Sequence, residues 1–139
     1  MPVTHDVLPR FNLAVFAYSG QVTYAEVAEA VAAVARHRDH TPSMNQLCDL
    51  SAVVGVERNF AALLQMQARI ADSLLPTYGD RLVVFYAPTP IARAIAETAR
   101  KSWDGLGSVL VRVLEREEDA LALLGLPHRH ISDLTHLGA

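Results

Sequence analysis

Strand-sized apolar segments alternate with helical segments along almost the whole chain, and this alternation constrains the fold more than any other feature. Two candidate strands come first, and each later strand is followed by a helical segment. Strands and helices in the order ββαβαβαβα predict an α/β fold, with a four- to five-stranded mixed, mainly parallel sheet and helices packed on it. The predicted strands are Val3–Leu8, Phe11–Tyr18, Asn45–Leu50, Leu82–Ala87 and Val109–Leu114.

Local signals place the helices between these strands. Thr23 and Glu26 have the spacing of a capping box, which predicts a helix that starts there and ends near His37. Thr89 followed by Pro90 predicts a helix with a threonine N-cap and a proline in its first turn. Helical periodicity or acidic first-turn residues predict the others, so that the helices cover 23–37, 58–75, 89–104 and 117–124.

Two strands indicate how the sheet is arranged. Leu82–Ala87 is apolar at every position, which is typical of a central strand that is buried on both faces and parallel to its neighbours. In Val109–Leu114, Arg112 falls on the face opposite to the valines, which favours a place near the sheet edge.

The length of 139 residues predicts a single domain. We expect this domain to cover residues 1–126, with a tail at 127–139 that is either an ordered appendage or frayed. About half of the residues (51%) are hydrophobic, which excludes a disordered chain.

Charge and cysteine content narrow the classes of partner and compartment. The net charge of −3 and the lack of a basic run argue against nucleic-acid binding. Cys48 is the only cysteine, so no internal disulfide forms and a reducing compartment is favoured. The N-terminus lacks a signal-peptide pattern and the apolar runs are too short to span a bilayer, so we expect a cytoplasmic protein.

Four segments, taken in order, resemble the STAS superfamily. They are a glycine–threonine–glutamate helix opening at 20–27, a strand ending in Asp-Leu at 45–50, the strand at 81–85, and the last strand and helix at 111–124. The resemblance is closer to the small stand-alone SpoIIAA-like proteins, whose fold is also compared with the lipid-binding SEC14 domain. It covers roughly residues 10–126 and implies a non-enzymatic regulatory or protein-binding domain.

The resemblance also bears on a phosphorylation site. In anti-sigma-factor antagonists of the superfamily, an Asp-Ser-Ser-Gly sequence opens the second long helix, and a partner kinase phosphorylates its second serine. The matching segment here is Glu57-Arg58-Asn59-Phe60, with Asn59 at the serine position. Because asparagine has no hydroxyl group, the resemblance implies no phosphoserine switch here.

The segment around that position is a candidate interaction corner, formed by Asp49, Ser51, Glu57, Arg58 and Asn59. Amide groups at a helix N-terminus attract anions, and Arg58 would add a charged donor for a phosphate or a lipid headgroup. The alternative reading is structural and is favoured: Glu57 complements the helix dipole, Asn59 helps to cap the helix, and Arg58 is solvated. Asp49 could act as an acid or base, but no partner group accompanies it, and we predict no catalytic residue.

An apolar pocket is a second candidate site. We expect Tyr86, Ile91, Ile95 and Trp103 to line a cavity between the sheet and the helix that begins at Pro90. The alternative is that these side chains are ordinary core material.

Cys48 and the histidines receive simpler interpretations. Cys48 lies in a predicted buried strand, which favours a small core residue over a nucleophile. The pairs His37/His40 and His128/His130 would hold a metal only with further ligands, so we predict surface histidines, no metal site and no cofactor.

Three functions remain open from the sequence. The first is a SpoIIAA/STAS-like regulatory domain that lacks the phosphorylatable serine and binds another protein or a second copy of itself. The second is a binder of a small apolar or lipid-like ligand in a SEC14-like cavity. The third is an enzyme, but the sequence shows no recognisable nucleophile, set of metal ligands or phosphate-binding loop that would support it.

Overall fold

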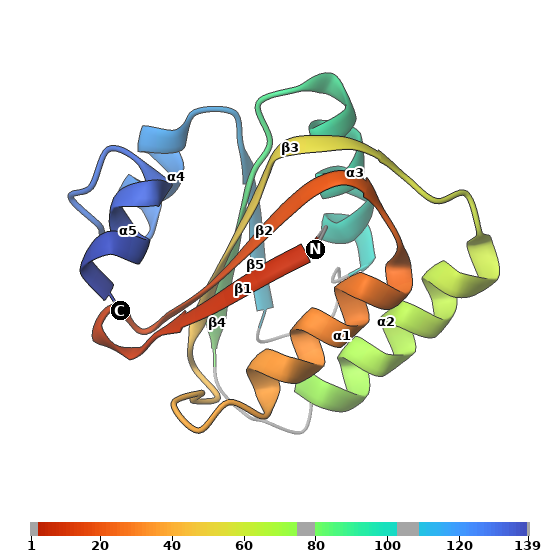
Figure 1. Cartoon of the computed structure of the whole chain (residues 1–139), viewed down its shortest axis with the longest axis horizontal. Helices are drawn as coiled ribbons and strands as arrows, with labels where there is room; N and C mark the ends of the chain where they lie inside the picture. Colours follow the sequence, from red (N-terminus) through yellow and green to blue (C-terminus); the bar gives the residue numbers. More distant parts are fainter. Residues whose placement is uncertain (1–2, 75–79, 103–108, 139) are drawn as a thin grey trace.

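The computed structural model describes residues 3–74, 80–102 and 109–138. Its centre is a five-stranded sheet whose strands lie side by side in sequence order (Figure 1). β1 is antiparallel to β2, and β2 to β5 are parallel to one another. The mixed, mainly parallel sheet predicted from the sequence is therefore confirmed. The strands are β1 (Val3–Leu8), β2 (Leu13–Val22), β3 (Asn45–Val56), β4 (Arg81–Tyr86) and β5 (Val109–Leu114).

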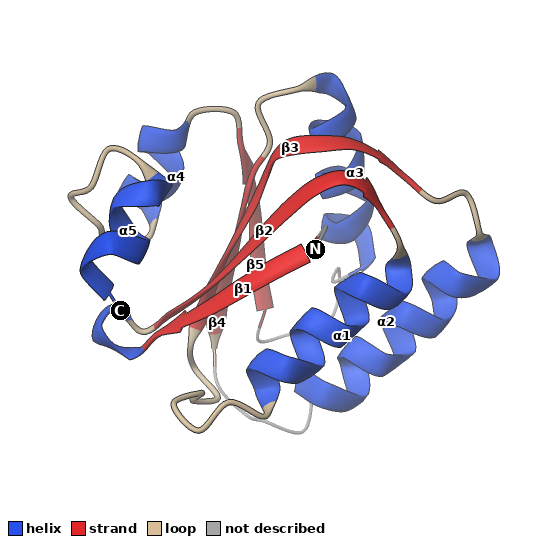
Figure 2. Cartoon of the chain, in the orientation of Figure 1, coloured by secondary structure: helices blue, strands red, loops and turns tan. Residues whose placement is uncertain are grey.

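Helices cover both faces of the sheet (Figures 1 and 2). The first face carries α1 (Tyr24–Ala35), α2 (Phe60–Leu74) and α3 (Pro90–Ser102), which connect consecutive parallel strands. Each of these connections joins a strand to the next strand in the same direction across the sheet. Because parallel crossover connections are almost always right-handed, all three helices lie on the same face. The second face is covered by the segment after β5, which forms α4 (Glu117–Leu123) and α5 (Ile131–Gly138).

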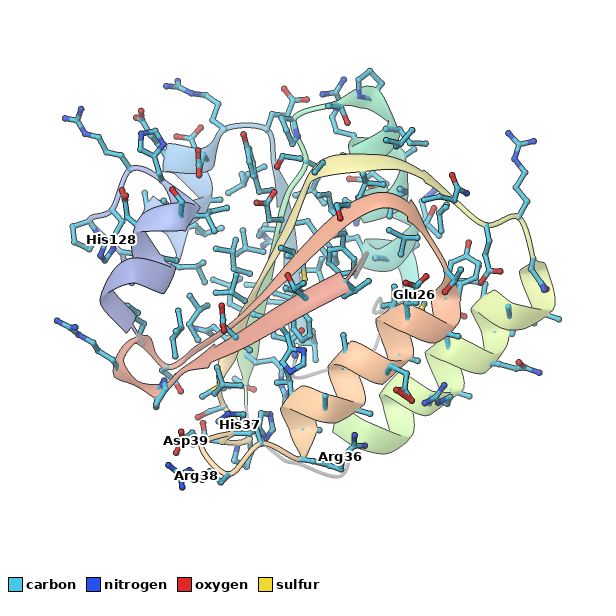
Figure 3. The ribbon with its side chains drawn as sticks, viewed as in Figure 1. Glu26, Arg36, His37, Arg38, Asp39 and His128 are labelled. Carbon is cyan, nitrogen blue, oxygen red and sulfur yellow. The ribbon has the colours of Figure 1, made fainter. Side chains whose placement is uncertain are left out.

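The predicted caps form as expected. At the start of α1, the Glu26 amide donates to Thr23 Oγ1 at 3.2 Å, and the Thr23 amide donates to Glu26 Oε1 at 3.1 Å (Figure 3). At the start of α3, Thr89 Oγ1 accepts a hydrogen bond from the Ala92 amide at 3.1 Å. Both helices therefore begin where a threonine side chain satisfies an otherwise free amide.

Several strand boundaries differ from the prediction. β2 covers Leu13–Val22 instead of Phe11–Tyr18, and it starts later because Pro9–Phe11 form a 3-10 turn (η1) that closes on Asn12 with a φ of 51°. β4 is shifted by one residue from the predicted Leu82–Ala87. β3 continues to Val56, whereas this strand was predicted to end at Leu50. The added part of β3 pairs with the end of β2 after register shifts near Gly20, whose φ of 65° suits a glycine.

The C-terminal segment is helical and packs on the second face. Ile131 and Leu134 of α5 are buried against that core. The Ile131 amide donates to Glu117 Oε1 at 2.6 Å, which ties the start of α5 to the start of α4. Of the two alternatives that the sequence left open, residues 131–138 follow the ordered one. None of the described helices has the length and hydropathy needed to cross a membrane.

Candidate functional site

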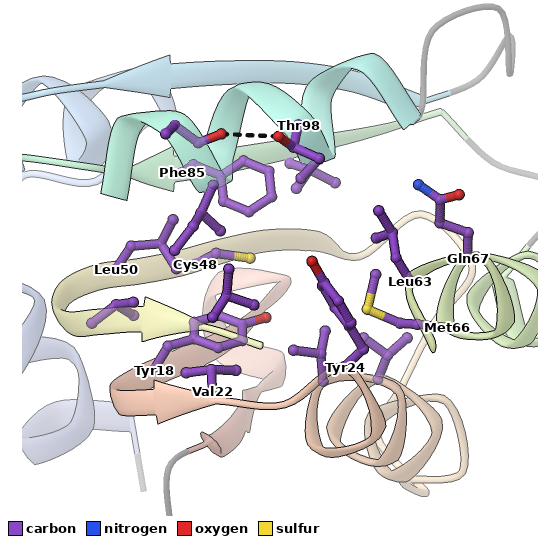
Figure 4. A pocket seen from close by; sticks show the side chains of 18 of the residues that line it. Tyr18, Val22, Tyr24, Cys48, Leu50, Leu63, Met66, Gln67, Phe85 and Thr98 are labelled. Atoms are coloured by element: carbon purple, nitrogen blue, oxygen red, sulfur yellow. Dashed lines mark hydrogen bonds between the residues drawn. The ribbon is translucent and has the colours of Figure 1, made fainter. Parts of the chain in front are cut away.

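The first face of the sheet holds a cavity of about 280 Å³. Its floor comes from β2, β3 and β4, one wall from α1 and α2, and the other wall from α3 (Figure 4). α1 lies over β1 and β2 and packs on α2, whereas α3 lies over β3 and β5. The cavity therefore occupies the space above the middle of the sheet, between the α1–α2 pair and α3.

Small side chains explain why this space stays open. Ala92 and Ala96 of α3 are fully buried and fill the contact with the sheet with little volume. Ala94 and Ala99 of the same helix line the cavity itself. A methyl group at each of these positions leaves a volume that a leucine or phenylalanine would fill, and protein interiors rarely leave such volumes empty.

The lining of the cavity is mainly apolar. One wall contributes Val27 and Val31 of α1 and Leu63 and Met66 of α2. The opposite wall contributes Ile95 of α3. Among the described residues that line it, no side chain carries a charge. Such a surface favours the apolar part of a small ligand.

Neutral polar groups interrupt the apolar lining. Tyr18 and Tyr24 both extend toward the cavity, near Cys48 on the floor and Met66 on the α2 wall (Figure 4). Thr98 uses its hydroxyl within α3, where it donates to the Ala94 carbonyl at 3.1 Å. The amide side chains of two glutamines, at positions 46 and 67, complete the polar part of the lining.

Burial keeps the deepest titratable groups neutral. Cys48 is only 3% exposed, and desolvation raises the pKa of its thiol to about 12, against a smaller opposing effect of its hydrogen bond with Tyr18. Desolvation also raises the pKa of the Tyr18 hydroxyl well above its ordinary value. A protonated, buried thiol is a poor nucleophile, which agrees with the predicted role of Cys48 as a core residue.

The predicted pocket residues have different positions. Ile91 and Ile95 line the cavity, whereas Trp103 lies outside the described residues. Tyr86 packs on the second face, so its expected place in this pocket was wrong. The reason is the two-residue alternation of β4, because Phe85 faces the cavity and its neighbour must face the other way.

Several cavity residues were not predicted. The α2 wall, with Leu63, Met66 and Gln67, and the floor residue Gln46 were not assigned to any site. Helical spacing of three and four residues at 63, 66 and 67 was the signal that could have found the wall. No signal in the sequence distinguished Gln46 from an edge residue of its strand.

The predicted interaction corner does not assemble. Because β3 continues to Val56, Asp49 lies within the strand, and roughly 25 Å of strand separates it from Glu57 at 3.3 Å per residue. Asp49 faces α5 on the second side of the sheet, where its Oδ1 accepts a hydrogen bond from the Ser51 amide at 2.9 Å. The expectation that these residues form one corner is therefore wrong.

Glu57 and Asn59, which lie between β3 and α2, have structural roles. Asn59 Oδ1 accepts the Ala62 amide at 3.0 Å, which caps α2 as predicted. Glu57 Oε1 accepts the Tyr24 amide at 2.7 Å, so its charge lies at the N-terminus of α1 rather than of α2. Arg58 is exposed, as predicted.

The histidines lie apart from the cavity. His37 follows α1 and its Nδ1 accepts the Asp39 amide at 3.1 Å, whereas His128 lies beside α5 with its ring against Phe11 (Figure 3). Within the described parts of the chain, no three His, Cys, Asp or Glu side chains gather as metal ligands would.

Comparison with known proteins identifies the fold. No protein-family model matches the sequence, and no curated protein matches it. Among solved structures, the chain is similar to the anti-sigma factor antagonist SpoIIAA in its unphosphorylated form, with a TM-score of 0.50 and 10% sequence identity. The match covers 88% of this chain and 97% of SpoIIAA. The chain therefore has the STAS-like fold of SpoIIAA, as the sequence resemblance predicted.

Proposed function

We propose that this domain binds a small, mainly apolar molecule in the cavity between the α1–α2 pair and α3. The observation that carries the proposal is the cavity itself, an apolar space of about 280 Å³ on the first face of the sheet. Ligand sites of small molecules are concave and mainly apolar, with a few polar groups that orient the ligand. The cavity has this composition, with tyrosine, glutamine and threonine side chains among valines, leucines and isoleucines.

The proposed role is binding rather than chemistry. The groups on the cavity floor that could react are the Cys48 thiol and the Tyr18 hydroxyl, and burial raises the pKa of both. In their protonated forms these groups act as weak hydrogen-bond donors and as packing surface. The described lining therefore offers shape and apolar area to a ligand.

A neutral polarity-sensitive dye tests this function. 1-Aminonaphthalene, which is small enough for a cavity of about 280 Å³, should shift its fluorescence emission and saturate on titration into the purified protein. Ala99→Phe, which places a ring in the cavity, should weaken dye binding at least about tenfold, because steric exclusion removes most of the buried contact area. Ala122→Phe on the exposed side of α4 is the matched control and should leave dye binding unchanged. Equal dye affinity in both variants, or no saturable binding by the unaltered protein, would overturn the proposal.

A regulatory, protein-binding role is the second candidate. The fold supports it, because SpoIIAA is an anti-sigma factor antagonist. The outer part of β3 offers a contact surface, because β4 pairs with β3 only at Gln46–Asp49 and Val54 beyond it is 76% exposed. Unpaired strand edges accept strands from other chains.

Sedimentation velocity at micromolar concentration tests the version in which the partner is a second copy. Val54→Lys should shift the protein to the monomer if this edge pairs with itself. The same sedimentation coefficient for both proteins would exclude self-pairing at this edge.

A further inference from the structure

The cavity floor contains one buried amide whose hydrogen-bonding groups the described structure does not use. Gln46 of β3 is 6% exposed, and its side chain lines the cavity. Its register neighbours are Ala14 on β2 and Val83 on β4, which offer no side-chain donor or acceptor. No hydrogen bond joins its amide group to another residue in the described parts of the chain.

Among the described residues, the Gln46 amide is not one of the fully buried polar groups without a partner, so its polar atoms still face the open space of the cavity. A ligand that fills this space removes water from the amide and must replace the hydrogen bonds that the water would make. Gln46 borders an open cavity, so a polar atom of a bound molecule can reach it without any change in the fold. The amide both donates and accepts, and it therefore matches a hydroxyl, a carbonyl or another amide.

The absence of charge in the described lining restricts the ligand further. A carboxylate, phosphate or ammonium group placed inside the cavity beside Gln46 would have to leave water for a surface of valine, leucine, isoleucine and neutral polar side chains. Moving an ion into such surroundings without an opposite charge is strongly unfavourable. A neutral polar group has a much smaller desolvation cost, and the Gln46 amide offsets it.

We infer that the cavity selects an uncharged, mainly apolar molecule that has one hydrogen-bonding group and meets the Gln46 amide. This inference rests on the proposed binding function and adds the chemical class of the ligand. The volume limits its size: a cavity of about 150 Å³ holds one benzene molecule, so 280 Å³ accommodates about ten to twelve non-hydrogen atoms. Small neutral alcohols, phenols or amides fit this description, and charged fatty acids and phospholipids do not.

Three ligands with the same hydrocarbon chain test the selection by charge. Octanol, octanoate and octylammonium are titrated calorimetrically into the protein at neutral pH. We expect octanol to bind at least about tenfold more tightly than either ion, because only the ions have an unpaired charge to desolvate. Octanoate or octylammonium binding as tightly as octanol would overturn the inference.

Gln46→Leu tests the role of the amide. Leucine keeps a similar volume and removes both hydrogen-bonding groups, so octanol affinity should fall by about three- to tenfold. The variant should keep the circular dichroism spectrum of the unaltered protein, which shows that it folds. Gln65→Leu, the same substitution at an exposed position of α2, should leave octanol affinity unchanged. Unchanged octanol affinity in Gln46→Leu would contradict the inference.

The two proposals fail in different ways. If neither the dye nor any of the three octyl compounds binds, the cavity has no binding function and both proposals fail. If the dye and octanoate bind in competition and Gln46→Leu has no effect, the binding function stands and the ligand class is wrong. If Gln46→Leu does not fold, the charge series with the unaltered protein still decides the inference.

Discussion

The two faces of the sheet are built from similar strands but differ in what the helices bring to them. On the second face, α4 and α5 contribute Leu121 and Leu134, which are fully buried against Leu47 and Val84. On the first face, α3 contributes Ala92 and Ala96 to the sheet contact, and α1 contributes Ala30, Val31 and Val34. Large helix residues fill one face, and small ones leave a cavity on the other. The helices, more than the strands, therefore determine where a ligand can enter this fold.

Truncation of a large side chain on the filled face should have the largest effect. Leu121→Ala removes a fully buried side chain, so the free energy of unfolding should fall by about 3 kcal/mol. Leu63→Ala on the cavity wall should cost about 1 kcal/mol or less, because that side chain already borders open space. Urea denaturation of both variants measures the difference. Equal losses would mean that the two faces are packed alike.

Enlargement should show the opposite pattern. Ala120→Leu on the filled face forces extra volume into a closed contact and should lower the free energy of unfolding by about 2 kcal/mol. Ala99→Leu enters the cavity and should change it by less than about 0.5 kcal/mol, because the added methyl groups find room there. Chemical denaturation again gives both values. A loss of about 2 kcal/mol for Ala99→Leu would show that the cavity wall cannot accept a larger side chain.

The strands and helix starts were predictable because their signals are local. The capping box at Thr23 and the apolar run of β4 act within a few residues, and the structure confirms both. The extension of β3 was not predictable in this way. Its residues 51–56 become a strand because β2 offers a partner across the register shifts near Gly20, and that pairing is a tertiary contact.

The site was less predictable than the fold. Ile91 and Ile95 were placed at a pocket because they follow an apolar helical stripe, and both line the cavity. The α2 wall was missed because it meets the α3 wall only after the chain has folded. The burial of Gln46 is likewise a property of the neighbouring strands and is not encoded in its own segment.

The buried thiol on the cavity floor should make the stability of the protein depend on pH. Burial raises the pKa of the Cys48 thiol from 9.0 to about 12, so the folded state holds this proton more tightly than the unfolded chain does. The resulting stabilisation is fully present below the unfolded pKa and is lost as the pH rises toward 12. Between about pH 8 and pH 10, the free energy of unfolding should fall by about 1 kcal/mol from this group. Cys48→Ala removes the thiol, and denaturation at the two pH values should show a smaller loss in this variant than in the unaltered protein.

The last prediction concerns the N-cap of α2, the helix that forms part of one wall of the cavity. Asn59→Ala removes the acceptor of the Ala62 amide and should lower the free energy of unfolding by about 1 kcal/mol or less. Asn59→Ser keeps an oxygen acceptor at the N-cap and should cost no more than a few tenths of a kcal/mol. Thermal unfolding of the two variants, followed by circular dichroism, separates them.

The serine variant also separates two roles of this position. A helix N-cap needs only an oxygen acceptor, which asparagine and serine both supply, whereas a phosphorylation switch needs a hydroxyl group. If Asn59→Ser is as destabilising as Asn59→Ala, the carboxamide has a role beyond capping. If Asn59→Ser is neutral, the position serves the fold with either residue. In that case either residue stabilises α2 as its N-cap, and the stability of this part of the cavity wall does not require the carboxamide.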